Sequence, residues 1–374
     1  MNKKKSIWIV LFEDFEVDGR VQRQVLGLKN DYNVKVFSCS HNSERKYYLD
    51  SVLFNLGSKY GFFSPMLNLF RLLKLRESKP DIIYVNNIYT VPSLILFKLM
   101  YPKAKFIYDS HELIVPDPKT NKSIASRKSI FLEWIATRVS DLVISTNSCR
   151  SNLMQDYYNL KSLPIAIENF VDLPHRNRDV TNFQINSITK YVYQGVLKPG
   201  RYLEEMIETF AAIRVKDKNH ELHILGFGPI EKALIDKAHS LGVLNTGVFF
   251  HGKKSRNELY EETPNFDVGL VIYDFSNMNN RYCSPNKTSE YVLSGLPILC
   301  TPQESLVKLV EEHCIGACFE RSALDHKDIA SLVETIINFT YSLPSYKSNI
   351  AESKTNFDFI NESKKLIDGI NEIF

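Results

Sequence analysis

The side chain that indicates chemistry most directly is Glu290, a lone carboxylate predicted to lie just inside a helix that follows a polar loop. The loop carries three further polar groups: Ser284, Asn286 and Lys287. Residues 267–273 and 298–300 have the pattern of buried strands, and Gly295 and Pro297 end the helix between them. We therefore expect Glu290 at the carboxyl edge of a parallel sheet, where open α/β folds bind ligands. A carboxylate there can bind a vicinal diol, although it could instead balance the dipole of its own helix.

A second strand-to-helix turn, residues 194–203, predicts an anion site. Gly200 lies in the turn, and Arg201 is expected in the first turn of the helix that follows. The amino terminus of a helix attracts anions through its unpaired N–H groups and its dipole. Because a cation at that end opposes the dipole, Arg201 is a better candidate for an anion ligand than for an ordinary surface residue. Lys198 is the alternative ligand.

The elements that position these residues alternate between strands and helices. In the first half, strands are predicted at residues 7–12, 34–38, 81–85, 105–109, 141–145 and 164–170. Helices are predicted at residues 19–28, 92–101 and 126–139, the last with Ile130, Phe131, Trp134 and Ile135 on one apolar face. In the second half, strands are predicted at residues 191–195, 222–226, 248–250, 268–273 and 298–300. This order predicts an α/β protein with two doubly wound, Rossmann-like domains and a cleft between them.

The length of 374 residues fits two domains of about 150 to 200 residues each. We expect a first domain at residues 1–170 and a second at 189–355. Residues 171–188 lose the periodicity and gain turn formers, which predicts an interdomain linker. The last helix, residues 356–374, is expected to pack back on the first domain.

Composition narrows the classes of function. A net charge of +3 without a long basic run argues against a nucleic-acid partner. The apolar run at residues 7–12 is too short for a signal peptide or a membrane span. The six cysteines show no Cys-x-x-Cys spacing, which favours a reduced cytoplasm. His313, Cys314 and Cys318 cluster, but ordinary packing is favoured over a metal site with so few ligands.

The order of strand, loop, Pro-Asn-Lys at 285–287, Glu290 and Gly-Leu-Pro at 295–297 resembles the nucleotide-sugar site of retaining glycosyltransferases of family four. That family has the two-domain GT-B fold. The resemblance spans nearly the whole chain and is most specific from residue 195 to residue 297. Family members normally carry a second acid eight positions before the one that matches Glu290, and here that position is Tyr282. In family members that keep this first acid, it contacts the transferred sugar. Its absence here therefore affects how the donor sugar would be recognised.

The spacing and the resemblance together assign roles residue by residue. The catalytic candidates are His111, Arg201 and Lys287. The donor-binding candidates are Gly19, Asp109, Gly195, Lys198, Gly226, Gly228, Gly252, Lys253, Ser284, Asn286 and Glu290. The acceptor-side candidates are Asp18, Arg20, which would bind an acceptor phosphate, and Glu112. His111 has a competing interpretation as a structural histidine that satisfies backbone groups at a strand end.

The resemblance implies a hexosyltransferase that works without a metal or a cofactor and retains the anomeric configuration. Its co-substrate would be a nucleoside diphosphate sugar of the UDP or GDP type. Its acceptor would be a saccharide or a lipid-linked saccharide, in polysaccharide or glycolipid assembly at the cell surface. Two alternatives stay open: a non-catalytic member that binds nucleotide sugars or glycans, and a nucleotide-sugar 2-epimerase. Donor sugar, base, linkage, acceptor and oligomeric state do not follow from the sequence.

Residues 60–76 combine many apolar side chains with the cations Arg71, Lys74 and Arg76. Four further cations follow on a later loop and helix: Lys119, Lys122, Arg127 and Lys128. The pattern is compatible with a helix that packs on the sheet and with a surface that docks on an anionic membrane. We expect a cytoplasmic protein, with the inner face of the cell membrane as its place of peripheral attachment.

Overall fold

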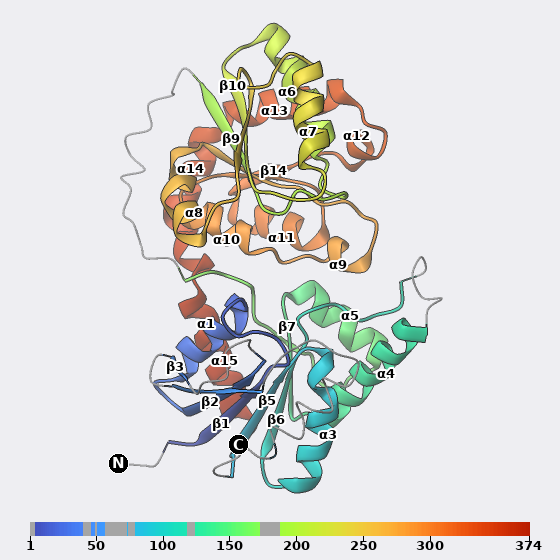
Figure 1. The fold of residues 1–374 in the computed structure, drawn as a ribbon, viewed down its shortest axis with the longest axis vertical. Helices are drawn as coiled ribbons and strands as arrows, with labels where there is room; N and C mark the ends of the chain where they lie inside the picture. Colours follow the sequence, from blue (N-terminus) through green and yellow to red (C-terminus); the bar gives the residue numbers. More distant parts are fainter. Residues whose placement is uncertain are drawn as a thin grey trace. The chain divides into compact units, whose positions relative to one another are not determined.

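The computed structural model describes residues 4–39, 46–48, 51–56, 73, 79–117, 124–172 and 188–374. The chain divides into two compact units, Met1–Asn169 with Phe359–Phe374, and Phe170–Asp358 (Figure 1). Most of the predicted linker, residues 173–187, lies outside the described residues. The same is true of Lys119, of Lys122 and of the segment 60–76 apart from Leu73.

The first unit is built on a sheet whose described strands run in the order β3-β4-β2-β1-β5-β6-β7-β8. These strands are β1 (Ser6–Val10), β2 (Asn33–Ser38), β3 (Lys46–Tyr48), β4 (Ser51–Asn55), β5 (Ile82–Asn86), β6 (Lys105–Asp109), β7 (Leu142–Ser145) and β8 (Ile165–Ala166). All neighbours pair in parallel except β3 and β4. The antiparallel pair at the edge is not among the predicted strands.

Helices cover both faces of this sheet because successive residues of a strand point to opposite sides. Ile7, Ile9 and Leu11 pack in one core with α1 (Gly19–Leu28) and α15 (Phe359–Glu372). Trp8 and Val10 pack in the other core with α3 (Val91–Met100) and α4 (Ile124–Val139). The short helix η1 (Ile88–Thr90) precedes α3, and α5 (Ser148–Tyr158) follows β7. The C-terminal helix α15 contacts α1 and belongs to this first unit.

The second unit has a parallel sheet in the order β11-β10-β9-β12-β13-β14. Its strands are β9 (Thr189–Gln194), β10 (His220–Leu225), β11 (Val248–Gly252), β12 (Val268–Val271), β13 (Ile298–Cys300) and β14 (Gly316–Cys318). One face is covered by α6 (Leu203–Lys216), α7 (Glu231–Ser240), α12 (Arg321–Asp325) and α13 (Ile329–Tyr341). The other is covered by α10 (Asn286–Leu293), α11 (Glu304–His313), α14 (Leu343–Ser353) and η3 (Lys354–Phe357). Two doubly wound units confirm the predicted fold class.

Two short helices, α8 (Arg256–Glu262) and α9 (Met278–Arg281), lie in the loops after β11 and β12, with η2 (Thr263–Asn265) after α8. In the described part of the chain, none of the helices has the length and apolar character that a membrane crossing demands.

The prediction for the apolar face of α4 is wrong. Phe131 and Trp134 are 59% and 43% exposed, whereas Ala136 of the same helix is fully buried. The side of α4 that meets the sheet carries Leu132, Ala136, Val139 and one buried acid, Glu133. The two large aromatic side chains therefore point away from the core of their own unit.

Candidate functional site

Polar loops follow the strands of the second sheet at its carboxyl edge. Gly195 follows β9 with a φ of +142°, a backbone conformation that favours glycine. Tyr273 lies two residues after β12, and the loop that carries Cys283 and Ser284 leads into α10. Because carboxyl ends of parallel strands meet at one edge, these loops come together there.

Lys287 is the most unusual side chain of this edge. It lies in the first turn of α10 and is only 9% exposed. Its Nζ lies 4.1 Å from the centre of the Tyr193 ring and 5.4 Å from that of Tyr273. Burial, joined by the charge of Arg201, lowers the pKa of Lys287 to about 7, although Glu290 acts in the opposite direction. Among the described residues, this ammonium forms no ion pair with a carboxylate.

Arg201 shares the Tyr273 ring with Lys287. Its guanidinium lies 4.1 Å from the centre of that ring, and its Nη1 donates to the Gly200 carbonyl at 2.9 Å. Helix α6 begins at Leu203 after Tyr202, so Arg201 precedes the helix and does not lie in its first turn as predicted. The turn requires Gly200, whose φ is +81° and where a Cβ would lie 2.7 Å from a carboxylate oxygen of Asp274. The two cations therefore converge on one aromatic ring.

Glu290 lies on the same helix as Lys287. Its Oε2 accepts a hydrogen bond from Nε2 of Gln194 at 2.5 Å, at the end of β9. Gln194 is itself fixed by Thr263, whose hydroxyl donates to Oε1 of Gln194 at 3.0 Å. The first turn of α10 holds no acid, so Glu290 lies beyond the turn where a carboxylate balances the dipole best. The competing interpretation of Glu290 as a dipole partner is weakened.

Gly226 and Gly228 allow the backbones of two loops of this edge to approach each other closely. A Cβ on Gly226 would lie 1.9 Å from the carbonyl oxygen of Gly195, and one on Gly228 would lie 2.2 Å from that of Leu197. Both obstacles are backbone atoms, which cannot rotate away. The structure thus gives these two glycines a packing role, and their role toward a donor stays a prediction.

We expect Gly226→Ala to destabilise the protein by about 3 kcal/mol, because the added methyl group forces two backbones apart. Gly247→Ala is a matched control, since its Cβ would meet only the flexible side chain of Arg214, with Cδ at 2.6 Å. Urea unfolding of both variants measures the difference. Equal free energies of unfolding would contradict the packing role.

Other predicted donor-binding residues lie around these loops. Gly252 ends β11 with a φ of +68°, and Nζ of the next residue, Lys253, lies 4.9 Å from the centre of the Phe227 ring. Three more of these residues line the surface of the unit: exposed Lys198, half-buried Ser284 and exposed Asn286. Lys198 is thus exposed, whereas Lys287 is buried.

The first unit brings six of the predicted residues to the carboxyl ends of its strands. Asp109 ends β6, is fully buried and binds Arg20 through two hydrogen bonds of 2.9 and 3.0 Å. Nη1 of Arg20 donates to the Ile167 carbonyl at 2.9 Å and to Asn169 at 2.7 Å. Burial alone would raise the pKa of Asp109, but the charges of Arg20 and His111 hold it well below its usual range. Arg20 is thus already engaged, and its role toward an acceptor phosphate stays a prediction.

His111 lies beside this ion pair. Its Nε2 is 3.1 Å from Oδ1 of Asn86 and 3.6 Å from Oδ2 of Asp109, and its Nδ1 is 3.9 Å from Oδ2 of Asp18. Asp18 caps α1, which begins at Gly19, by accepting from the N–H of Val21 at 3.0 Å. The three polar neighbours orient the imidazole, and its competing interpretation as a structural histidine stays open. Glu112 is exposed on the same loop.

No family model matches the sequence, and no curated protein matches it. Solved structures are similar over almost the whole chain. A sucrose-phosphate synthase from Thermosynechococcus elongatus has a TM-score of 0.74 and 11% identity over 99% of both chains. A UDP-forming α,α-trehalose-phosphate synthase from Burkholderia xenovorans has a TM-score of 0.72 and 12% identity over 99% of both chains. Anabaena HepE in complex with UDP has a TM-score of 0.70 and 16% identity, covering 98% of this chain and all of that one.

The chain has the GT-B fold. At this level of identity the similarity establishes the fold and does not identify the substrates. Within the described residues, no cluster of three or more His, Cys, Asp or Glu side chains is arranged to hold a metal ion.

One buried acid of this GT-B protein was not predicted from the sequence. Glu133 on α4 is fully buried and accepts hydrogen bonds from the hydroxyls of Tyr108 and Ser110, the latter at 2.7 Å. Burial raises the pKa of Glu133 to about 7, although both hydrogen bonds oppose that shift. Ser110 directly precedes His111, so Glu133 helps to fix the loop that carries the histidine. The helical periodicity held no signal for this acid, because it predicted the face with Phe131 and Trp134 as the apolar one.

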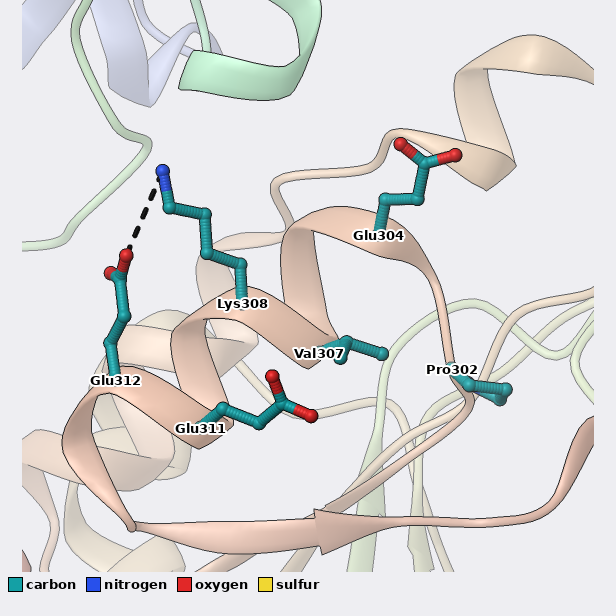
Figure 2. Close-up of a pocket in the computed structure, with 6 residues that line it drawn as sticks. All are labelled: Pro302, Glu304, Val307, Lys308, Glu311 and Glu312. Carbon is teal, nitrogen blue, oxygen red and sulfur yellow. Dashed lines mark ion pairs between the residues drawn. The ribbon is translucent and has the colours of Figure 1, made fainter.

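Tyr282 stands at the position where the resemblance predicts a second acid, and a carboxylate lies beside it. The hydroxyl of Tyr282 donates to Oε1 of Glu304 at 3.0 Å. Glu304 opens α11 and lines a surface depression together with Pro302, Val307, Lys308, Glu311 and Glu312 (Figure 2). Lys308 lies 3.7 Å from Glu312, which leaves this depression acidic. A polyanion is therefore better accommodated at the edge formed by Arg201 and Lys287 than in this depression.

Proposed function

We propose that this GT-B protein is a glycosyltransferase that moves a hexose unit from a nucleoside diphosphate sugar to an acceptor hydroxyl. The donor is of the UDP or GDP type, and the reaction retains the anomeric configuration without a metal ion. The acceptor is a saccharide or a lipid-linked saccharide in the assembly of a cell-surface polysaccharide or glycolipid. The UDP complex of the similar Anabaena structure supports the choice of a nucleotide as ligand.

The observation that carries this proposal is the buried lysine beside a second cation. Lys287 and Arg201 contact the same Tyr273 ring, and their repulsion adds to the cost of burying the lysine. A buried ammonium without a carboxylate partner is unfavourable unless an anion binds to it. A pyrophosphate supplies that anion and gains negative charge as the bond to the sugar breaks, so the two cations stabilise the leaving group.

The remaining residues of the edge fit the rest of a nucleotide sugar. Glu290 would bind the ribose diol with its carboxylate, held in place by Gln194. Tyr282 and Glu304 place a hydroxyl and a carboxylate at the position where the resemblance expects contact with the transferred sugar. The leaving phosphate would take the proton of the acceptor hydroxyl on the face it departs from, which accounts for retention without a protein nucleophile.

Incubation with a panel of nucleotide sugars tests the proposal. Slow release of free nucleotide marks a transferase that hydrolyses its donor in the absence of an acceptor. An isomerised sugar would instead identify a 2-epimerase, and an unchanged but bound ligand would identify a binding protein. Either of these two outcomes would overturn the proposal.

We expect Glu290→Gln to weaken binding of the nucleoside diphosphate by about 1 to 3 kcal/mol, the range for losing a charge-assisted hydrogen bond. Glu334→Gln removes an exposed carboxylate from α13 of the same unit and is the control. Isothermal titration calorimetry measures both affinities. Unchanged affinity in a folded Glu290→Gln variant would remove the ribose assignment.

The outer face of α4 supports peripheral attachment to a membrane. Arg127, Phe131, Trp134 and Arg138 follow one another at helical spacing and are all exposed. The rings of Phe131 and Trp134 stack with centres 6.1 Å apart, and the Arg138 guanidinium lies 4.3 Å from the centre of the Trp134 ring. Aromatic side chains between cations are typical of helices that lie on anionic bilayers.

We expect Phe131→Glu and Trp134→Glu to abolish flotation with vesicles that contain phosphatidylglycerol, because each places an anion against the lipid surface. Arg127→Gln should weaken binding by about 1 kcal/mol, the contribution of one cation near an anionic surface. Tyr341→Glu, at an 81% exposed aromatic residue on α13, is the control. A wild-type protein that fails to float at any lipid composition would contradict the membrane proposal.

A further inference from the structure

Two cysteines lie side by side in the sheet of the second unit. Cys300 ends β13 and Cys318 ends β14, and the two residues are direct partners in the parallel pairing of these strands. Their sulfur atoms are 3.3 Å apart, close enough for one thiol to donate a hydrogen bond to the other. Both thiols are free. No unfolding is needed to bring them together.

The two thiols differ in environment. Cys300 is fully buried, whereas Cys318 is half-buried on β14, the last strand at that side of the sheet. A hydrogen bond from the Cys300 thiol lowers the pKa of Cys318, although burial and the charge of Glu311 oppose that shift. The same contact, followed by burial, raises the pKa of Cys300. Cys318 is therefore the sulfur that forms a thiolate and meets a reagent first.

We propose that Cys300 and Cys318 form an oxidisable dithiol that low-molecular-weight disulfides convert to an intramolecular disulfide. The Cys318 thiolate attacks one sulfur of the reagent and displaces the first small thiolate. Cys300 then gives its proton to the displaced small thiolate, attacks the Cys318 sulfur and displaces the second small thiolate. Two protein thiols are oxidised to one disulfide, and one small disulfide is reduced to two thiols.

The dithiol lies next to the residues that support the two cations. Thr301 follows Cys300, and its hydroxyl accepts from the Tyr273 N–H at 3.0 Å. Gln303 continues the same turn and donates to the Tyr273 carbonyl at 2.7 Å. Because Tyr273 carries the ring under Arg201, a backbone shift at Cys300 would reach this ring through Thr301 and Gln303. We therefore expect oxidation to lower the affinity of the site for nucleoside diphosphates, an expectation that rests on the proposed function.

The thiol chemistry is tested on the reduced full-length protein with oxidised glutathione, in the absence of nucleotide. We expect the loss of two of the six thiols and one cross-linked peptide pair that contains Cys300 and Cys318. Cys314→Ser, which removes an exposed thiol, should leave this cross-link in place. Cys300→Ser should stop the reaction at a mixed disulfide on Cys318. A cross-link to Cys283 instead, or a stable mixed disulfide on Cys318 of the wild type, would overturn the proposal.

Phenylarsine oxide provides a second measurement that needs no oxidation, because trivalent arsenic binds two adjacent thiols with release of water. We expect one arsenical per chain in the wild type and in Cys314→Ser, and none in Cys318→Ala, a small change at a half-buried site that the fold should tolerate. Wild-type protein that binds no arsenical would contradict the pairing.

Calorimetry with UDP and GDP should then give an affinity lower by about fivefold or more in the oxidised protein. Equal affinities would overturn the coupling, whereas a reduced protein without nucleotide binding would point to failure of the proposed function.

Discussion

Replacing Lys287 by methionine is expected to lower kcat/KM by about 100-fold or more, while the folded protein becomes more stable. The activity falls because the leaving phosphate loses a buried cation. The stability rises because methionine fills the same volume without a buried charge. An enzyme assay and a thermal unfolding curve measure the two effects. A variant that loses stability and activity together would indicate a structural role for Lys287 instead.

The pH dependence of nucleotide binding gives an independent readout of Lys287. In the empty site its pKa is about 7, and a bound diphosphate favours the charged form and raises that pKa. Binding therefore takes up a proton, and the affinity of the wild type should fall as the pH rises above 7. In Lys287→Met this fall should disappear. Lys198→Met, which removes an exposed cation near the same turn, should retain it.

The sign of the stability effect follows from the same pKa. The folded pKa of Lys287 lies below that of an unfolded lysine, so folding releases a proton around neutral pH. The stability of the wild type therefore improves as the pH rises from about 7 toward the pKa of a free lysine, about 10.4. The advantage of Lys287→Met over the wild type should shrink over that interval. An advantage independent of pH would show that Lys287 is not buried in its charged form.

Arg201→Ala is expected to lower kcat by about 100-fold, with a smaller change in KM. The guanidinium is fixed by the Tyr273 ring and the Gly200 carbonyl, so it is positioned before the leaving group develops its charge. A change confined to KM would show that Arg201 binds ground state and transition state equally. Wild-type values of both parameters would make Lys198 the better candidate.

Arg201 and Lys287 should also be coupled. The charge of Arg201 is one cause of the low pKa of Lys287, so Arg201→Ala should raise that pKa. The pH at which nucleotide affinity begins to fall should then move upward in this variant. Lys198→Ala should leave it in place. An unchanged pH profile in Arg201→Ala would show that the two cations do not share one site.

The local pattern of the chain was enough to predict the fold class and the edge at which Glu290 and Lys287 lie. Buried strands need continuous apolar runs, and their carboxyl ends must meet at one edge of a parallel sheet. The short antiparallel pair β3–β4 and the outward face of α4 were missed or wrongly predicted. Strand length and helix orientation in these places are decided by neighbours that periodicity does not reveal.

Long-range packing alone decided the state of the functional groups. The sequence does not indicate a partner for Arg20, but Asp109 on a distant strand forms a buried ion pair with it. Lys287 is a catalytic candidate in the sequence, but its low pKa arises only because it is buried beside Arg201 and two tyrosine rings. The sequence therefore determined which residue types reach the edge of each sheet. Only the tertiary structure decided their charge and partners, because burial and Coulomb energy depend on groups brought together from distant parts of the chain.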